Sequence, residues 1–194
     1  MLEGIIITAA VLAGVMVVVA AFASTRPDHF KIARSTTIAA PSAAIYPLIA
    51  DLHRFNTWNP FALKDPYAKG HYEGPPNGVG AGYVFDGSKS GTGRIDVVDT
   101  KPDAAVIMRL LMTRPMAADN RIAFTLEPQG DATRIATRVT WAMEGAVPFV
   151  GKLVSLVLDC ETMVGPDFEA GLASLKALAE GSAPLGPGRT AGGT

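Results

Sequence analysis

Few residues in this chain are of a type that could perform chemistry, and they are scattered. The three histidines, His29, His53 and His71, stand in separate polar stretches, and no two of them have the spacing of a metal site. Cys160 is the only cysteine, which excludes an internal disulfide and a cysteine-based metal site. Because it falls on an apolar helical pattern, we interpret it as a buried small hydrophobe rather than a reactive thiol. The sequence therefore predicts no metal and no cofactor.

His71 and Glu73 form the best acid–base pair that the sequence offers. They border a Gly- and Pro-rich stretch, where ordinary loop polarity also accounts for both residues. Strand alternation predicts that Asp86 and Asp96 point outward, and that Arg109 lies over apolar neighbours on an external face with its charged head in water. We therefore treat His71 and Glu73 as weak candidates and assign no catalytic residue.

Composition excludes two further classes of partner. The net charge is −1 and the isoelectric point is near 6.3, so the chain has no basic field for a nucleic acid backbone. The glycines at 78, 80 and 82 lack the spacing of a dinucleotide-binding motif, and the segment 87–90 lacks the first glycine of a phosphate-binding loop. These glycines predict tight turns between short strands.

An uncharged apolar run covers residues 5–23. At about 1.5 Å of rise per residue, a helix of this length is about 28 Å long, close to the thickness of a bilayer core. We therefore predict that residues 1–26 form an N-terminal transmembrane anchor. A cleaved signal segment is the alternative, because Ala21-Phe22-Ala23 resembles a cleavage site, but no Lys or Arg precedes the run. Three basic residues that follow it slightly favour a cytoplasmic domain, namely Arg26, Lys31 and Arg34.

Residues 27–180 predict one α+β domain, and the tail 181–194 is too poor in apolar residues to fold. The domain begins with a strand and two short helical segments, continues with antiparallel strands joined by short turns, and closes with a long amphipathic helix. We expect Pro166 to bend or interrupt this helix. The expected elements are the strand 30–39, the helical segments 42–51 and 53–58, the strands 80–87, 92–100, 104–113, 121–127 and 133–143, and the helix 148–180.

This order of elements resembles the helix-grip fold. The segments DLHRFNTWNPF (51–61), 72–74 with 78–80, 83–87 and VGPDFEAGLASLK (164–176) are similar to the SRPBCC (START-like) group of bacterial polyketide cyclase/dehydrase and lipid-transport proteins, many of which carry an N-terminal hydrophobic anchor. Phe61 and Phe85 stand where relatives often have Trp, and Pro166 stands where a helix-compatible residue is usual. The resemblance implies a curved antiparallel sheet wrapped around the long C-terminal helix, with a cavity between them.

Alternation within the strands and the helix predicts the lining of that cavity. The expected lining is apolar, and its methionines would adapt to varied apolar shapes. Two questions stay open: whether these side chains fill the core instead, and whether Trp58 and Phe61 cap the cavity or anchor the second short helix. The predicted ligand-binding residues are Trp58, Phe61, Phe85, Val97, Met108, Leu110, Met112, Phe124, Trp141, Met143, Leu153, Val157, Val164 and Phe168.

The resemblance implies that the chain binds or transports a hydrophobic small molecule, lipid or polyketide-like, at a membrane surface. One alternative is an enzyme of the cyclase or dehydratase type that uses His71 or Glu73 near the cavity mouth. Another is a structural membrane-associated protein with a filled core. The expected partners are a hydrophobic ligand and the membrane, with no nucleic acid, and the oligomeric state stays open.

Overall fold

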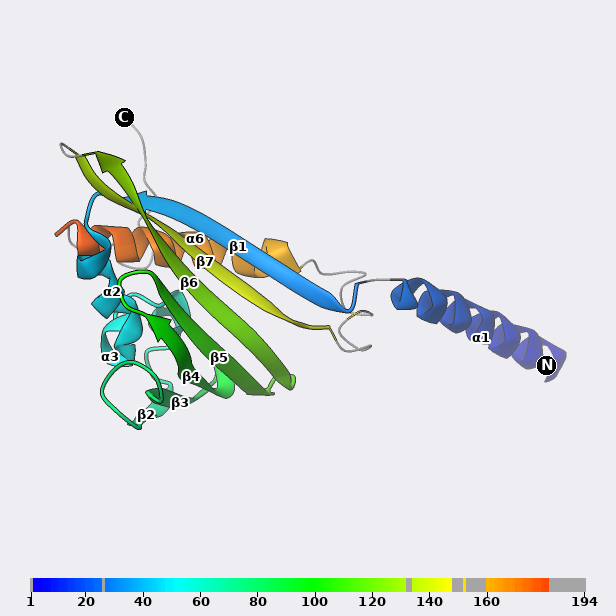
Figure 1. Cartoon of the computed structure of the whole chain (residues 1–194). Helices are drawn as coiled ribbons and strands as arrows, with labels where there is room; N and C mark the ends of the chain where they lie inside the picture. Colours follow the sequence, from blue (N-terminus) through cyan, green and yellow to red (C-terminus); the bar gives the residue numbers. More distant parts are fainter. Residues whose placement is uncertain (1, 26, 132–133, 148–151, 153–159, 182–194) are drawn as a thin grey trace, which may run out of the picture.

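A computed structural model describes residues 2–25, 27–131, 134–147, 152 and 160–181 (Figure 1). Seven antiparallel strands form one curved sheet, and a C-terminal helix packs against it, which is the arrangement of the helix-grip fold. The elements are α1 (Leu2–Ser24), β1 (His29–Ile38), α2 (Ser42–Ala50), α3 (Leu52–Phe55), α4 (Pro60–Lys64), β2 (Lys69–Glu73), β3 (Gly82–Gly87), β4 (Gly91–Lys101), β5 (Ala105–Arg114), β6 (Ala118–Asp131), β7 (Arg134–Ala146) and α6 (Cys160–Ala179).

The sheet has the strand order β1-β7-β6-β5-β4-β3-β2. Strands β2 to β7 are neighbours in sequence and in space, because short turns join them. The first strand instead pairs with the last, in a register that places Arg34 opposite Trp141. Helix α6 lies across the inner face behind β1 and β7, α2 and α3 lie beside one end of it, and α1 extends away from the sheet (Figure 1).

Two polar side chains determine where the short helices α3 and α4 begin. Asp51 caps α3, since its carboxylate accepts hydrogen bonds from the backbone N–H groups of His53 at 2.9 Å and Arg54 at 3.4 Å. Asn59 caps α4 in the same way through Phe61 N–H at 3.2 Å, and Pro60 occupies the first helical turn. The sequence prediction missed α4 and the edge strand β2.

The C-terminal helix differs from the expected one at Pro166. Helix α6 (Cys160–Ala179) continues through Pro166, so the proline does not interrupt it. Residues 148–159 of the expected helix lie almost entirely outside the described residues, as do Leu153, Val157 and the tail from 182 onward. Gly165 forms a contact point between α6 and β1, because a Cβ there would lie 2.4 Å from Nη2 of Arg34. Arg34 also donates from Nε to Oε1 of Glu169 at 2.8 Å.

The predicted transmembrane anchor is not supported. Residues 2–24 do form a helix, but no helix among the described residues is long and apolar enough to cross a membrane.

Buried aromatic rings form the centre of the core. Trp141 stacks on Phe168 of α6, with ring centroids 4.2 Å apart and an angle of 9° between the planes. Phe55, Trp58 and Phe124 surround the same indole, mostly edge-on. The close approach needs Gly171, because a Cβ there would lie 2.7 Å from Cζ3 of Trp141. The rings thus join the sheet, α3 and α6.

Ile135 shows where alternation alone fails to predict burial. It shares the inward parity of Trp141 on β7, which by itself would predict a buried side chain. Its side chain is 64 % exposed, because β6 and β7 extend as a two-stranded hairpin beyond the elements that cover the sheet.

Candidate ligand-binding cavity

A cavity of about 430 Å³ lies between the inner face of the sheet, the α3–α4 segment and α6. Its volume is within the range of about 300 to 1,000 Å³ that is typical of small-molecule sites. Most of its lining is apolar. The lining residues are Phe55, Asn56, Asn59, Phe61, Ala62, Asp65, Pro66, Ala68, Tyr83, Phe85, Lys89, Ser90, Ile95, Leu110, Met112, Asn120, Ile122, Trp141, Met143, Val164 and Phe168.

The structure divides the predicted ligand-binding residues into two sets. Those that line the cavity are Phe61, Phe85, Leu110, Met112, Trp141, Met143, Val164 and Phe168. Those that lie in the packed core instead are Trp58, Val97, Met108 and Phe124, each no more than 1 % exposed. Trp58 is an anchor rather than a cap, because its Nε1–H donates to the carbonyl of Leu48 at 2.8 Å. Phe61 is on the cavity wall.

Strand pairing explains why the cavity opens over β3 to β5. Leu110 lies opposite Ile95 on β4 and opposite Asn120 on β6, so these three side chains share the inner face. Gly93 allows Met112 and Phe85 to pack close to β4, since a Cβ there would lie 2.4 Å from the backbone oxygen of Leu111 and 3.0 Å from both Sδ of Met112 and Cζ of Phe85.

Sequence reasoning missed the polar part of the lining. The expected strand began at Arg121, which left Asn120 in a turn, whereas β6 begins at Ala118 and places Asn120 on the inner face with Ile122. Alternation back from Ile122 would have found it. Asp65, Lys89 and Ser90 come from α4 and the β3–β4 turn, which only the tertiary structure brings together.

Asp65 is a buried carboxylate at the wall of the cavity. Its Oδ2 accepts hydrogen bonds from the backbone N–H groups of Lys89 at 2.8 Å and Ser90 at 3.0 Å, and from the Ser90 hydroxyl at 3.0 Å. The bonds from Ser90 and Lys89 lower the pKa of this carboxyl, because they stabilise its charged form. Asp65 therefore fixes the β3–β4 turn against α4 and stays ionised at neutral pH.

Tyr83 is the other lining residue with a perturbed pKa. Burial raises the pKa of its phenol, and the neighbouring Tyr72 adds to this effect. Its hydroxyl lies over Gly70, where a Cβ would lie 2.2 Å from that oxygen. The phenol of Tyr83 is therefore uncharged at neutral pH, and its ring forms part of the cavity wall.

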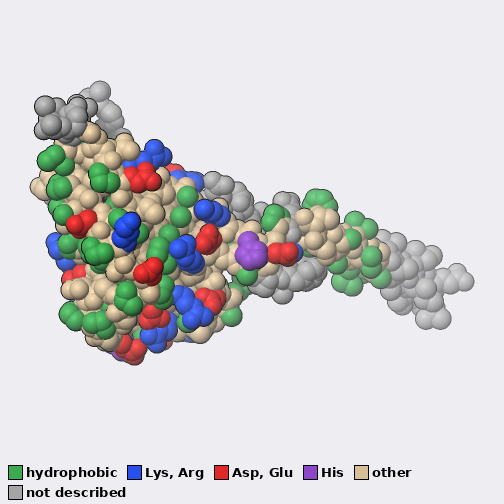
Figure 2. Space-filling view, in the orientation of Figure 1, with side chains coloured by type: hydrophobic (Ala, Val, Ile, Leu, Met, Phe, Trp, Pro, Cys, Tyr) green, Lys and Arg blue, Asp and Glu red, His purple; other side chains and the backbone are tan. Residues whose placement is uncertain are grey.

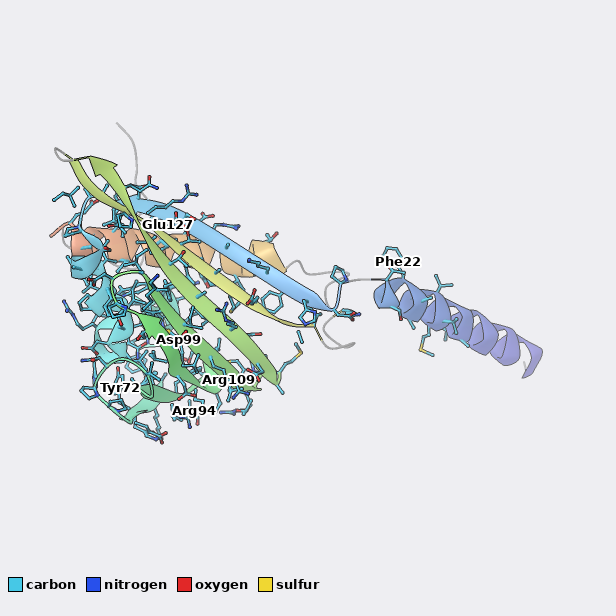
Figure 3. The ribbon with its side chains drawn as sticks, viewed as in Figure 1. Phe22, Tyr72, Arg94, Asp99, Arg109 and Glu127 are labelled. Carbon is cyan, nitrogen blue, oxygen red and sulfur yellow. The ribbon has the colours of Figure 1, made fainter. Side chains whose placement is uncertain are left out.

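His71 and Glu73 do not border the cavity, which corrects their expected position. They belong to β2, and their pairing with Val84 and Gly82 places them on the outer face of the sheet. His71 Nε2 lies 3.0 Å from Oε1 of Glu73, and Glu73 Oε2 lies 3.4 Å from Nη2 of Arg94. Figure 3 labels Arg94 at this end of the sheet. Both candidates therefore contact solvent and other charges instead of a ligand in the cavity.

The outer face carries paired charges. Arg109 is 52 % exposed and forms a two-point ion pair with Asp119, as expected for an external side chain. Arg121 pairs with Glu144 at 3.1 Å. Figure 2 shows Lys and Arg interspersed with Asp and Glu over this face. An open groove of about 640 Å³ lies there, but these four charged side chains of its lining already pair with one another.

Comparisons with known proteins agree with this architecture. A solution structure from Thermobifida fusca is 19 % identical, with a TM-score of 0.57 over 80 % of this chain and 97 % of that one. Norcoclaurine synthase from Thalictrum flavum, in complex with dopamine and hydroxybenzaldehyde, is 14 % identical, with a TM-score of 0.56 over 77 % and 86 %. Ginseng major latex-like protein 151 from Panax ginseng is 13 % identical, with a TM-score of 0.55 over 79 % and 99 %.

These likenesses show the fold alone, and no curated protein matches the sequence. The family comparison is more informative, because it covers residues 29–180, which is the whole domain from β1 to the end of α6. The chain belongs to the family described as polyketide cyclase / dehydrase and lipid transport.

Proposed function

We propose that the domain binds an apolar small molecule, lipid or polyketide-like, in the cavity between the sheet and α6, and that it acts as a carrier or binding protein. The observation that carries this proposal is the cavity of about 430 Å³ with its largely apolar wall. Membership of a family that includes lipid-transport proteins supports it.

The cavity favours a binding domain over a domain with a filled core. Leu110, Met112 and Met143 are only partly buried although their strands lie inside the sheet, because no side chain from α4 or α6 fills the space in front of them. A protein interior without a ligand is normally packed to near-crystalline density. Space of this size beside flexible methionines is typical of a site that adapts to an apolar ligand.

The ionisable groups of the wall favour binding over acid–base catalysis. A general acid or base needs a pKa near the working pH and a proton within reach of the substrate. Asp65 has a lowered pKa and Tyr83 a raised one, so both pKa values move away from neutrality. The other two candidates, His71 and Glu73, lie on the opposite face of the sheet. A cyclase or dehydratase therefore remains the second candidate, favoured only by the family description.

The location of the domain at a membrane is also a proposal, and it rests on the uncharged run 5–23. Several apolar side chains of α1 are exposed in the part of the chain that the structure describes: Met16, Val17 and Val18 are each more than 60 % exposed. Exposed apolar surface of this kind favours contact with lipid or with another protein. A carrier attached in this way would exchange its ligand directly with the bilayer.

A cavity-filling variant tests the binding function. Leu110→Trp places an indole in the cavity and should abolish most binding of the neutral fluorescent probe N-phenyl-1-naphthylamine, since the ring occupies the probe's space. Leu111→Trp is the matched control, because the same change on the next residue of β5 lies on the outer face. Equal probe affinity for wild type and both variants would contradict binding in this cavity, as would the absence of any binding to wild type.

A further inference from the structure

Two side chains that line the cavity have a buried polar atom without a hydrogen-bond partner among the described residues, namely Oδ1 of Asn120 and Nε1 of Trp141, and Asn120 is the only one of the two whose side chain is mainly polar. Asn120 is 8 % exposed and lines the cavity, and its side chain forms no hydrogen bond with any of the described residues. Buried amides are nearly always hydrogen-bonded, because an unsatisfied donor or acceptor loses its hydration without compensation. An unpaired buried amide at a binding site therefore indicates a group that meets its partner on the ligand.

The residues next to Asn120 on the inner face of the sheet have no polar side chain. Leu110 lies opposite it on β5, Gly145 lies opposite it on β7, and Ile122 is the next inward residue on its own strand. None of these side chains can donate or accept a hydrogen bond. The Asn120 amide thus lies within an apolar part of the cavity wall.

Gly145 holds this amide in place. A Cβ at Gly145 would lie only 2.1 Å from Oδ1 of Asn120 and 3.0 Å from Cε1 of Phe30. The amide oxygen therefore occupies the space that any larger residue at 145 would take, and Asn120 contributes to the lining of the cavity. An amide can present either its N–H₂ or its oxygen after a half-turn, so it can donate to or accept from a ligand group.

We propose that Asn120 is a specificity-determining residue that selects an apolar ligand with one hydroxyl or carbonyl group, and that it does so by hydrogen bonding to that group. The proposal rests on the binding function proposed above. The ligand class is a largely apolar molecule, whose polar atom lies at β6 and whose body extends towards the aromatic side chains of Trp141, Phe168 and Phe61. Trp141 lies four residues along β7 from the partner of Asn120, about 13 Å at the usual strand rise.

Two probes of nearly equal shape separate the hydrogen bond from apolar contact. 1-Naphthol and 1-methylnaphthalene differ by a hydroxyl in place of a methyl group. Their dissociation constants would be measured by competition with N-phenyl-1-naphthylamine on wild type, on Asn120→Leu and on the control Asn77→Leu, which makes the same change in an exposed loop. Asn120→Leu should weaken 1-naphthol about three- to tenfold relative to 1-methylnaphthalene, and Asn77→Leu should leave the ratio unchanged.

The unfolding midpoint in urea provides the second measurement. Without ligand, Asn120→Leu should keep or raise the midpoint, because it replaces an unpaired buried amide with an apolar side chain of similar volume. A lower midpoint would overturn the proposal by showing that the amide has a structural partner. If the leucine variant does not fold, Asn120→Ala removes the amide without adding volume and is measured in the same way.

The outcomes distinguish the two proposals. If wild type binds none of the three probes, the proposed binding function fails, and the role of Asn120 fails with it. If wild type binds them but Asn120→Leu leaves the ratio of the two naphthalene affinities unchanged, the cavity binds ligands and only the role of Asn120 is overturned.

Discussion

Met108 and Leu110 provide the sharpest test of the cavity. They are two residues apart on β5 and share its inner face, but Met108 is fully buried in the core whereas Leu110 faces the cavity. Met108→Lys loses about 2 kcal/mol of side-chain burial and also buries an ammonium without a partner, so we expect a loss of at least about 4 kcal/mol in the free energy of unfolding. Leu110→Lys should lose only about 1 to 1.5 kcal/mol, because its ammonium can stay hydrated in the cavity.

Urea denaturation measures both losses. With a slope of about 2 kcal/mol per molar urea for a domain of this size, the midpoint should fall by about 2 M for Met108→Lys and by about 0.5 to 0.75 M for Leu110→Lys. Val98→Lys is the control, because Val98 is 45 % exposed and the change should alter stability by no more than about 0.5 kcal/mol. Equal falls at 108 and 110 would refute the reasoning, since they would mean that both side chains are enclosed.

The pH dependence provides an independent check on the same variants. Burial lowers the pKa of a lysine in the folded state below its unfolded value of about 10.4. Between these two values the unfolded chain binds more protons, so stability rises with pH. The deficit of Met108→Lys should therefore shrink as the pH rises from 7 towards 10, whereas that of Leu110→Lys should change little. A pH-independent deficit at 108 would contradict the burial of that ammonium.

Four further predictions concern Asp65, Gly171, the pair His71 and Glu73, and the N-terminal segment. The pKa of Asp65 in the folded state is lowered from 3.8. The stabilising effect of its carboxylate should therefore be fully present above pH 3.8 and lost as the pH falls through the lower pKa of the folded state. The difference in urea midpoint between wild type and Asp65→Asn should accordingly disappear in acid and persist at neutral pH. Gly171→Val should destabilise by about 1 to 3 kcal/mol in thermal or urea unfolding, since its Cβ would lie 2.7 Å from Trp141, whereas Ala173→Val on the exposed side of α6 should not. His71→Ala and Glu73→Gln should leave probe affinity near wild type; a large loss would place them at the ligand after all. Full-length protein should fractionate with membranes and residues 27–180 should not; full-length protein recovered in the soluble fraction with Met1 present would exclude the anchor.

The pattern of apolar residues determined most of the architecture in advance. The strand 133–143 alternates clearly between two faces, and the short turns between the strands from 92 to 143 leave antiparallel pairing as the available arrangement. The spacing of Phe168, Leu172 and Leu175 predicted the buried stripe of the closing helix, and all three are buried. Such features are local, because the period of a side-chain pattern is set by the geometry of its own strand or helix.

The tertiary structure decided what alternation could not, namely which inner-face side chains of the sheet are covered by other elements. Alternation gives Ile135 and Trp141 the same face, and Met108 and Leu110 the same face, but only the placement of α4 and α6 leaves Ile135 in solvent and Leu110 at a cavity. It also placed His71 and Glu73 on the outer face, because the register of β2 against β3 depends on pairing between residues that are nine to seventeen positions apart in the sequence. The burial of a side chain and the register of a strand both depend on the whole sheet, so neither can be predicted from a single segment of the sequence.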